Sequence, residues 1–468
     1  MSKSLSSDYL IIGSGAMGMA FADTLLTETK ANIIIVDRFA KPGGHWNVAY
    51  PFVTLHQPST FYGVSSRELS QGLKDQVGLN KGLNDLASGQ DVLRYYDDVM
   101  RHQFLPSGRV QYFPMCDYKG GGKFKNKLSG ETFEVSYKKL VDCTYLKTHV
   151  PSTHTPNFEI TEGVTFMPLN DLPKLTQAPD MFNVIGGGKT GIDALLWLLE
   201  MGVNPDKIQW VISRDAWLLD RQNTQPTAEF FSSTMGAQAA QFESIANAES
   251  VEDMFDRLEA SGYFVRIDKN VRPEMFHGAT ISQAELIALR QIKNIVRLGH
   301  VTKIEPHLIT LKKGSVPSTP GTVHIDCSAS ALKADLKPTL IFDSDVITPQ
   351  MVRSYQPIFS ASLIAHVEAT FPDDNTKKND VCGVVPLPNA DMDYMKMTAA
   401  NMMNQYKWSQ NSEISNWLLN NRLDGFSKMV SEIGADETEK RAIMKRLRNN
   451  AMPAVMKLQN FIAQAGAG

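Results

Sequence analysis

The residues of this chain whose types and spacing best indicate chemistry are glycines, gathered in two short and well-separated runs. The first run, Gly13-Ser14-Gly15-Ala16-Met17-Gly18, follows the apolar residues 9–12. Because glycine has no Cβ, a phosphate group can approach such a backbone closely. A helix that begins at the run also offers free N–H groups and the positive end of its dipole. The first run therefore predicts a binding site for a phosphate-containing ligand.

The elements around this run make the prediction more specific. Residues 19–29 are predicted as an amphipathic helix, and the apolar residues 33–36 as a second strand that ends at Asp37. Asp37 lies 19 residues after Gly18, close to the ~20 typical of a dinucleotide-binding fingerprint. The acid is expected to accept hydrogen bonds from ribose hydroxyls. The predicted contact residues of this site are Gly13, Gly15, Ala16, Met17, Gly18, Asp37 and Arg38.

The second run lies about 170 residues further along and ends differently. It reads Gly186-Gly187-Gly188-Lys189-Thr190-Gly191 and stands between a predicted strand and an apolar helix. The next strand ends at Ser213-Arg214, so a hydroxyl and a guanidinium replace the carboxylate. This pair suits a 2′-phosphate and favours NADPH over NADH, although Arg214 could instead be a surface arginine paired with Asp215 or Asp220. The predicted contact residues are Gly186, Gly188, Lys189, Thr190, Gly191, Ser213 and Arg214.

A segment after the first fingerprint carries a family resemblance. It reads Gly43-Gly44-His45-Trp46 and continues through Tyr50-Pro51 to His56-Gln57. With the acid-ended fingerprint, it resembles the flavin-containing monooxygenases of class B and their Baeyer–Villiger and N-hydroxylating relatives. The resemblance implies that the first site binds FAD, with Gly44, His45 and Trp46 beside it. It also places His56 and Gln57 near the flavin ring as candidate catalytic residues, while a structural role for His56 fits the sequence equally well.

The same resemblance implies an α/β fold of two Rossmann-type domains, similar to glutathione reductase, with the NADPH domain inserted into the FAD domain. On this plan, residues 1–165 form the first part of the FAD-binding domain. Residues 175–300 form the NADPH-binding domain with a helical insert at 229–262, and residues 301–385 form the second part of the FAD-binding domain. Residues 386–468 are a helical C-terminal extension. The echoing sequences Asp142-Cys143-Thr144 and Asp326-Cys327-Ser328 are expected on strands that enter and leave the inserted domain.

The activity implied by the resemblance is a monooxygenase reaction on a small molecule. NADPH would pass a hydride to flavin N5, and reduced flavin would react with O₂ to a C4a-(hydro)peroxyflavin. The family's linker signature, which has a glycine and a histidine, is absent from residues 164–172. A flavin-dependent NAD(P)H reductase or dehydrogenase that does not oxygenate its substrate is therefore the alternative. A non-catalytic dinucleotide sensor is a third hypothesis, against which the intact glycines of both sites argue.

Composition limits the other classes of function. The chain has 468 residues, 43% of them apolar and 21% charged, and a net charge of −3 that gives no basic surplus for nucleic acid. No apolar run approaches the ~20 residues of a membrane span, and no metal site is expected. The four cysteines form no CxxC pair, which argues against a disulfide reductase and fits the reducing cytoplasm. The predicted helices at 229–262 and 391–465 could cap a substrate pocket or form a homodimer contact.

Overall fold

In the computed structural model, which describes residues 2–146, 148–329, 336 and 338–466, the N-terminal apolar runs form the centre of the first sheet. Its main strands follow the order β19-β20-β6-β1-β2-β3, and the hairpin of β4 and β5 joins it through β6. Strands β20, β6, β1, β2 and β3 run parallel to one another. The strand bounds are β1 Lys3–Ile12, β2 Ile33–Val36, β3 Val110–Phe113, β4 Cys116–Gly120, β5 Lys123–Asn126, β6 Thr132–Asp142, β19 Phe342–Asp343 and β20 Val346–Ile347.

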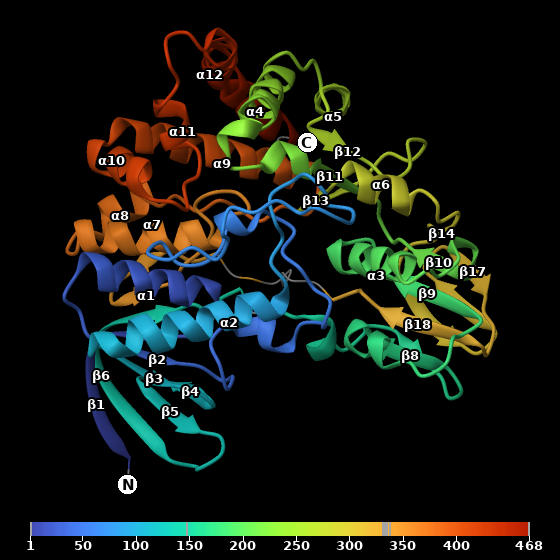
Figure 1. Ribbon diagram of the computed structural model, residues 1–468, viewed down its shortest axis with the longest axis horizontal. Helices are drawn as coiled ribbons and strands as arrows, with labels where there is room; N and C mark the ends of the chain where they lie inside the picture. Colours follow the sequence, from blue (N-terminus) through green and yellow to red (C-terminus); the bar gives the residue numbers. More distant parts are fainter. Residues whose placement is uncertain (1, 147, 330–335, 337, 467–468) are drawn as a thin grey trace.

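Two helices that lie far apart in the sequence pack against each other beside the first sheet. Helix α1 (Ala16–Glu28) is covered by α7 (Pro357–Thr370), and α2 (Gly89–Val99) lies nearby (Figure 1). Phe21 of α1 and Ile364 of α7 are fully buried. Thr24 and Ser362 share a hydrogen bond of 2.8 Å across the pair. The C-terminal part of the chain thus completes the first unit.

A second sheet contains the second glycine run. Its five strands are parallel and follow the order β14-β10-β9-β18-β8. A four-stranded sheet, β17-β16-β15-β7, belongs to the same half of the molecule, and α3 and α6 pack with the parallel sheet. The bounds are β7 Glu159–Ile160, β8 Thr165–Pro168, β9 Met181–Ile185, α3 Lys189–Glu200, β10 Ile208–Val211, α6 Gln283–Leu289, β14 Asn294–Val296, β15 Val301–Glu305, β16 Leu308–Leu311, β17 Gly314–Pro317 and β18 Thr322–Asp326.

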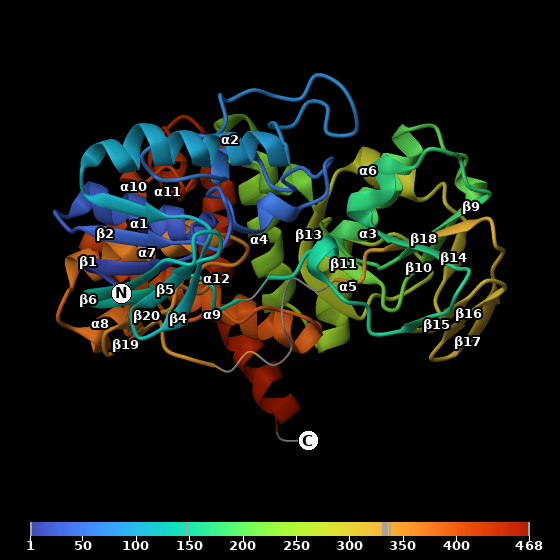
Figure 2. The same ribbon diagram turned by 90° about the horizontal axis from the view of Figure 1, so that it is seen from below.

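A small sheet and several of the remaining helices lie between the two larger units. Figure 2 shows the first and second sheets at opposite sides of the molecule, with α4, α9 and α12 between them. The small sheet has the order β12-β11-β13, and α12 packs on both α4 and α9. The bounds are β11 Ala216–Asp220, α4 Phe231–Ala246, α5 Val251–Ala260, β12 Phe264–Val265, β13 Met275–Ile281, α8 Asn375–Val381, α9 Asp391–Gln410, α10 Ser412–Asn420, α11 Ser427–Ser431 and α12 Thr438–Gly466.

Short helical turns join these elements. A turn of π-helix spans Met100–Phe104, and 3₁₀ turns span Gly44–Val48, Ser59–Phe61, Leu105–Ser107, Pro151–Thr153, Leu169–Lys174, Pro205–Lys207, Arg221–Thr224 and Ala228–Phe230. The predicted helices at 229–262 are found as α4 and α5. Helix α12 continues through Pro453. Among the described residues, no helix is both long and apolar enough to span a membrane.

The strand pairing differs from the domain boundaries expected from the sequence. Strand β8 starts at residue 165, and β18 lies between β8 and β9, so both belong to the second sheet. The sequence assigned residues from 301 onward to the first unit. In the structure, the first described strands that rejoin that unit are β19 and β20, at residues 342–347. The two Asp-Cys strands are the last described strands before the chain crosses between the units, because β7 and β8 follow β6, and β19 follows β18. Each lies beside the glycine-ended strand of its own sheet.

Candidate functional site

The first fingerprint has the close helix–strand contact that its glycines predict. Gly13 ends β1 with φ +96°, a conformation that favours glycine. A Cβ placed on Gly18 would lie 2.0 Å from the carbonyl oxygen of Gly13. No side chain caps the start of α1, where Gly15 is the N-cap and Ala16 and Met17 begin the first turn. The free N–H groups of this turn are available to an anion.

The Gly-Gly segment that carried the family resemblance lies against this turn. The Gly43 N–H donates to the Ser14 carbonyl at 2.8 Å. A Cβ on Gly44, whose φ is +57°, would lie 2.9 Å from the Gly15 Cα. The next residues form a 3₁₀ turn in which Trp46 Nε1 donates to the Tyr62 hydroxyl at 2.6 Å. The ring of His45 stacks on Trp46 at 5.5 Å. The structure thus brings Gly44 to the first fingerprint and orients Trp46 through its indole.

Asp37 follows β2 directly and is buried against the fingerprint loop. Its Oδ2 accepts from the Ser14 N–H at 2.5 Å and from the Ser14 hydroxyl at 2.7 Å. Its Oδ1 accepts from the Phe39 N–H at 2.7 Å. Arg38 is instead exposed, with its guanidinium 5.0 Å from the centre of the Phe39 ring. The acid thus lies at the glycine turn as predicted, whereas the Arg38 side chain is exposed and lies over the Phe39 ring.

The second fingerprint repeats the geometry of the first. Gly186 has φ +141°, and a Cβ on Gly191 would lie 2.2 Å from the Gly186 carbonyl oxygen. Gly188 is the N-cap of α3 and has open space around it, because a Cβ at this position would have no described atom within 4 Å. Lys189 and Thr190 form the first turn of α3. The predicted glycines are therefore brought together at an uncapped helix N-terminus.

Arg214 binds neither of the acids that were its alternative partners. Its Nη2 donates to the Asn389 Oδ1 at 2.8 Å, while Asp215 pairs with Arg297 at 2.9 Å. Asp220 accepts from the Gln283 amide at 2.7 Å. Among the described residues, the hydrogen-bond partner of the Arg214 guanidinium is thus a neutral amide, which leaves its positive charge uncompensated. Ser213 is half-buried beside it, after the end of β10.

His56 and Gln57 lie where the two halves of the chain meet. The half-buried His56 ring has an Nδ1 that is inaccessible and has no hydrogen-bond partner among the described residues. Its burial, with the nearby charges of Lys189 and Arg221, lowers the pKa of His56 to about 3. The Gln57 amide donates to the Tyr355 carbonyl at 3.0 Å. His56 is therefore neutral at physiological pH.

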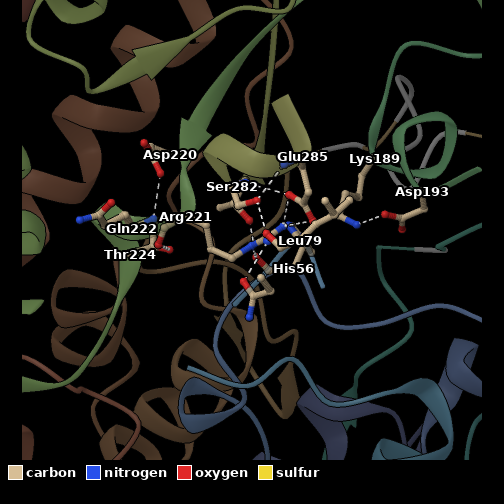
Figure 3. Close-up of polar contacts among 12 residues, drawn as sticks. His56, Leu79, Lys189, Asp193, Asp220, Arg221, Gln222, Thr224, Ser282 and Glu285 are labelled. Carbon is tan, nitrogen blue, oxygen red and sulfur yellow. Dashed lines mark hydrogen bonds and ion pairs between the residues drawn. The ribbon is translucent and has the colours of Figure 1, made fainter. Parts of the chain in front are cut away.

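A buried arginine holds this segment, and sequence reasoning missed it. Arg221, only 1% exposed, donates to both carboxylate oxygens of Glu285 at 3.0 and 2.7 Å (Figure 3). It also donates to the Asn80 Oδ1 at 3.0 Å and to the His56 carbonyl at 3.3 Å. The Thr280 hydroxyl donates to the same carbonyl. Only the capping box Ser282-x-x-Glu285 was visible as a local signal, because the other partners are distant in sequence.

Lys189 has a second network at the same junction. Its ammonium pairs with Asp193 one turn along α3, and the Tyr50 hydroxyl donates to Asp193 at 2.5 Å. Figure 3 shows this pair and the Arg221 cluster side by side. Burial raises the pKa of the Tyr50 hydroxyl, with Asp193 as a further cause. Tyr50 thus remains a proton donor to the carboxylate.

A cavity of about 610 Å³ opens beside Gln57 and Tyr355. Helices α4, α9, α10 and α11 and the turn after β11 form most of its wall. Tyr355 has an unusual φ of +61°, and its ring fills the space above Gly278, where a Cβ would lie 2.0 Å away. The sequence left the roles of residues 229–262 and 391–465 open; in the structure, both regions line this cavity. Its volume falls in the range of small-molecule sites.

The described residues hold no group of three or more His, Cys, Asp or Glu side chains that could bind a metal ion. The four cysteines are free. Cys143 and Cys327 each lie beside a glycine turn, 3.6 Å from the Cβ position of Gly18 and 3.8 Å from that of Gly191, respectively.

Comparison with known proteins finds relatives that are similar in sequence and solved structures that are similar in fold at low sequence identity. No model of a protein family matches the chain. The Uncharacterized protein Rv2000 of Mycobacterium tuberculosis (strain H37Rv) is 46% identical over 423 residues, which span 90% of this chain and 78% of the relative. The Uncharacterized protein Mb2023 of Mycobacterium bovis matches to the same extent.

Among solved structures, cyclohexanone-bound cyclohexanone monooxygenase in the Rotated conformation has a TM-score of 0.50 and 11% identity. The match covers 96% of this chain and 98% of that one. A flavin-containing monooxygenase from Stenotrophomonas maltophilia has a TM-score of 0.46 and 13% identity, over 78% of this chain and 98% of that one. The first of these likenesses shows that this chain, over 96% of its length, has the fold of that cyclohexanone monooxygenase.

Proposed function

The chain belongs to one family with the two mycobacterial proteins, and on that premise we propose that it is an oxidoreductase that uses FAD and NADPH. The observation that carries the proposal is the pair of glycine turns at residues 13–18 and 186–191, which we call the first and second glycine cradles. At each, a Cβ on the last glycine would lie about 2 Å from the carbonyl oxygen of the first. Such contact between strand and helix is what a dinucleotide-binding turn requires. The fold likeness to cyclohexanone monooxygenase supports the same reading.

In the proposal, the first cradle takes FAD. The backbones of Gly15 and Gly44 lie close together without side chains, which would allow a pyrophosphate to approach them. The uncapped start of α1 would donate N–H groups to that pyrophosphate. Asp37 would hold the ribose, since its carboxylate already lies at the turn. When bound, flavin supplies the redox chemistry by accepting a hydride and passing electrons on. Trp46, His56 and Gln57 would lie beside the bound FAD, and Gln57 also lines the cavity.

The second cradle takes NADPH in the proposal. Arg214, whose charge has no acidic partner among the described residues, would bind the 2′-phosphate, with Ser213 as a neighbouring donor. Strands β8 to β10, β14 and β18 form the NADPH domain, which therefore extends to residue 326. The FAD domain combines β1 to β6 with β19, β20 and α7.

The cavity receives a small-molecule substrate, and the reaction is a monooxygenation with O₂ as co-substrate. Gln57 and Tyr355 line the cavity, and the Gln57 amide donates to the Tyr355 carbonyl. His56, neutral at physiological pH, adds no charge there, and a site with few free protons limits wasteful release of hydrogen peroxide. A reductase without oxygenation is the second candidate. It is favoured by residues 164–172, which form β8 and a 3₁₀ turn and carry neither glycine nor histidine.

The test is the absorbance of the purified chain. We expect a flavin spectrum that NADPH bleaches in the absence of oxygen and that air restores. A transient band, distinct from those of the oxidised and reduced flavin, together with incorporation of labelled oxygen into product, would support the monooxygenase. Restoration without either would favour the reductase. Purified protein that neither contains nor takes up FAD would refute both.

A further inference from the structure

The charges in the cavity wall form a small and unusual set. Its described lining residues include three charged side chains, Asp220, Arg353 and Asp424, and no lysine. Apolar side chains form much of the rest, among them Met235, Phe242, Met397, Met402, Leu418 and Phe426. Which ligands can enter therefore depends on whether any of the three charges is free.

Arg353 and Asp424 neutralise each other within the wall. The guanidinium donates to the Asp424 carboxylate at 2.7 Å and to its carbonyl at 3.3 Å. Both residues are buried, and the guanidinium lies 3.7 Å from the centre of the Phe359 ring. The other carboxylate oxygen accepts from the N–H groups of Phe426 and Ser427 at 3.2 and 2.6 Å, which caps α11. The pair thus presents no net charge to the cavity.

The third charge, Asp220, has only neutral hydrogen-bond partners among the described residues, so its negative charge is not balanced there. One oxygen accepts from the Gln222 N–H at 3.0 Å and the other from the Gln283 amide at 2.7 Å. Within the described part of the cavity wall, no cation is therefore left to balance an anion. Moving a carboxylate or phosphate from water into such a site without a counter-charge is costly.

The polar groups that face the cavity are neutral. Amides come from Gln238 on α4 and from Asn401 and Gln405 on α9. The side chains of Gln238 and Gln405 have no hydrogen-bond partner among the residues that the structure describes. An amide can donate and accept, so these groups suit a ligand with neutral polar atoms.

We propose that the substrate of this cavity is a largely apolar molecule that carries a neutral hydrogen-bonding group and no negative charge, and that the Arg353–Asp424 pair sets this preference against anions. The inference rests on the proposed function, because it names the substrate class of the same site. Anionic molecules are rejected since the arginine of the described wall is already paired.

Equilibrium dialysis of the full-length protein against three probes of one shape tests this. The probes are 2-acetylnaphthalene, 2-naphthoate and 2-(aminomethyl)naphthalene, which are uncharged, anionic and cationic at neutral pH. We expect the uncharged and the cationic probe each to bind at least about tenfold more tightly than the carboxylate. Binding of the carboxylate as tight as that of either other probe would overturn the proposal. This comparison of probes uses the wild-type protein, so its result remains valid even if a substitution impairs folding.

The variant Asp424→Asn sharpens the test. It keeps an oxygen that can cap α11 but removes the charge that neutralises Arg353. We expect the affinity ratio of naphthoate to acetylnaphthalene to rise at least about tenfold, because a charge-assisted hydrogen bond becomes available to the anion. The matched control is Glu368→Gln, which breaks another buried pair, with Lys378 at 2.7 Å, outside the cavity wall. Its ratio should stay at the wild-type value.

An unchanged ratio in a folded Asp424→Asn protein, or the same rise in Glu368→Gln, would show that the pair does not set the preference. The readout needs neither turnover nor cofactor reduction. Protein that lacks flavin yet selects the uncharged probe over naphthoate would refute the proposed function and leave the charge preference standing. Flavin-containing protein that binds naphthoate best would refute the charge preference and leave the proposed function standing.

Discussion

At the first fingerprint, a Cβ on Gly18 would lie 2.0 Å from the Gly13 carbonyl oxygen, and at the second, a Cβ on Gly191 would lie 2.2 Å from that of Gly186. The likeness extends to the neighbouring strands. Asp142 accepts hydrogen bonds from the N–H and hydroxyl of the residue two positions on, at 2.9 and 2.6 Å. Asp326 does the same at 2.9 and 2.6 Å. The two regions therefore share the same local backbone arrangement.

They diverge where the second strand of each unit ends. Asp37 is buried and bound to its own glycine loop, whereas Arg214 reaches across to Asn389 on the segment before α9. The shared part is what close packing of helix and strand demands, and any dinucleotide would need it. The divergent part carries opposite charge, so it can distinguish one dinucleotide from another. Substitutions in the two parts should therefore have different effects.

The largest effect is expected at the last glycine of each cradle. Gly18→Ala and Gly191→Ala each place a methyl group against a backbone carbonyl that cannot move aside. We expect each to lower the free energy of unfolding by at least about 3 kcal/mol, the upper part of the usual cost of overpacking. Urea unfolding measures this. Gly188→Ala, whose Cβ meets nothing within 4 Å, is the control and should unfold near wild type. Equal stability of Gly191→Ala and Gly188→Ala would contradict the packing role.

A smaller effect, confined to one ligand, is expected at Arg214. Arg214→Ala should weaken NADPH binding by about 1.5–3 kcal/mol, the range for a lost hydrogen bond to a charged group. NADH binding should change little, because NADH lacks the 2′-phosphate. Fluorescence titration with both nucleotides measures the difference, and Arg101→Ala, at an exposed arginine of the first unit, is the matched control. Equal weakening of both nucleotides would remove Arg214 from the 2′-phosphate site.

The effect that is smallest at neutral pH, and that grows as the pH falls, concerns His56 at the junction of the two regions. The folded protein holds its pKa near 3, whereas the unfolded chain has a value near the ordinary 6.5. Between these values the unfolded state binds more protons, so stability falls as the pH drops from about 6.5 toward 3. In His56→Asn this contribution is absent, and the decline in the free energy of unfolding should be shallower than in wild type. Parallel pH profiles of the two proteins would show that His56 does not resist protonation.

Much of the two cradles could be predicted from sequence because their signals are local. Each needs a strand, closely spaced glycines and a helix within about thirty residues, which is the fingerprint itself. The helices α4 and α5 and the hairpin of β15 and β16 also follow from short-range patterns. The placement of β18 in the second sheet does not follow from a short-range pattern, because a strand buried between two others has the same apolar sequence in either sheet.

The junction and the cavity could not be predicted for the same physical reason. Arg221 reaches Glu285, Asn80 and His56, which lie 64, 141 and 165 residues away. The pairing of Arg353 with Asp424 spans 71 residues. A charged residue with no local partner looks like a solvated surface residue in the sequence. Only the packing of whole units reveals that these two arginines are buried.

The covering of α1 by α7 bears on how the protein is made. The apolar face of α1 emerges from the ribosome early, but the helix that buries it, with Ser362 opposite Thr24 and Glu368 opposite Tyr9, follows more than 300 residues later. Throughout that interval, the nascent chain must carry an unfinished first unit with exposed apolar surface. The second unit, with all five strands between residues 165 and 326, can close in the meantime. We therefore expect the first unit to be completed after the second, although most of its strands come earlier in the sequence.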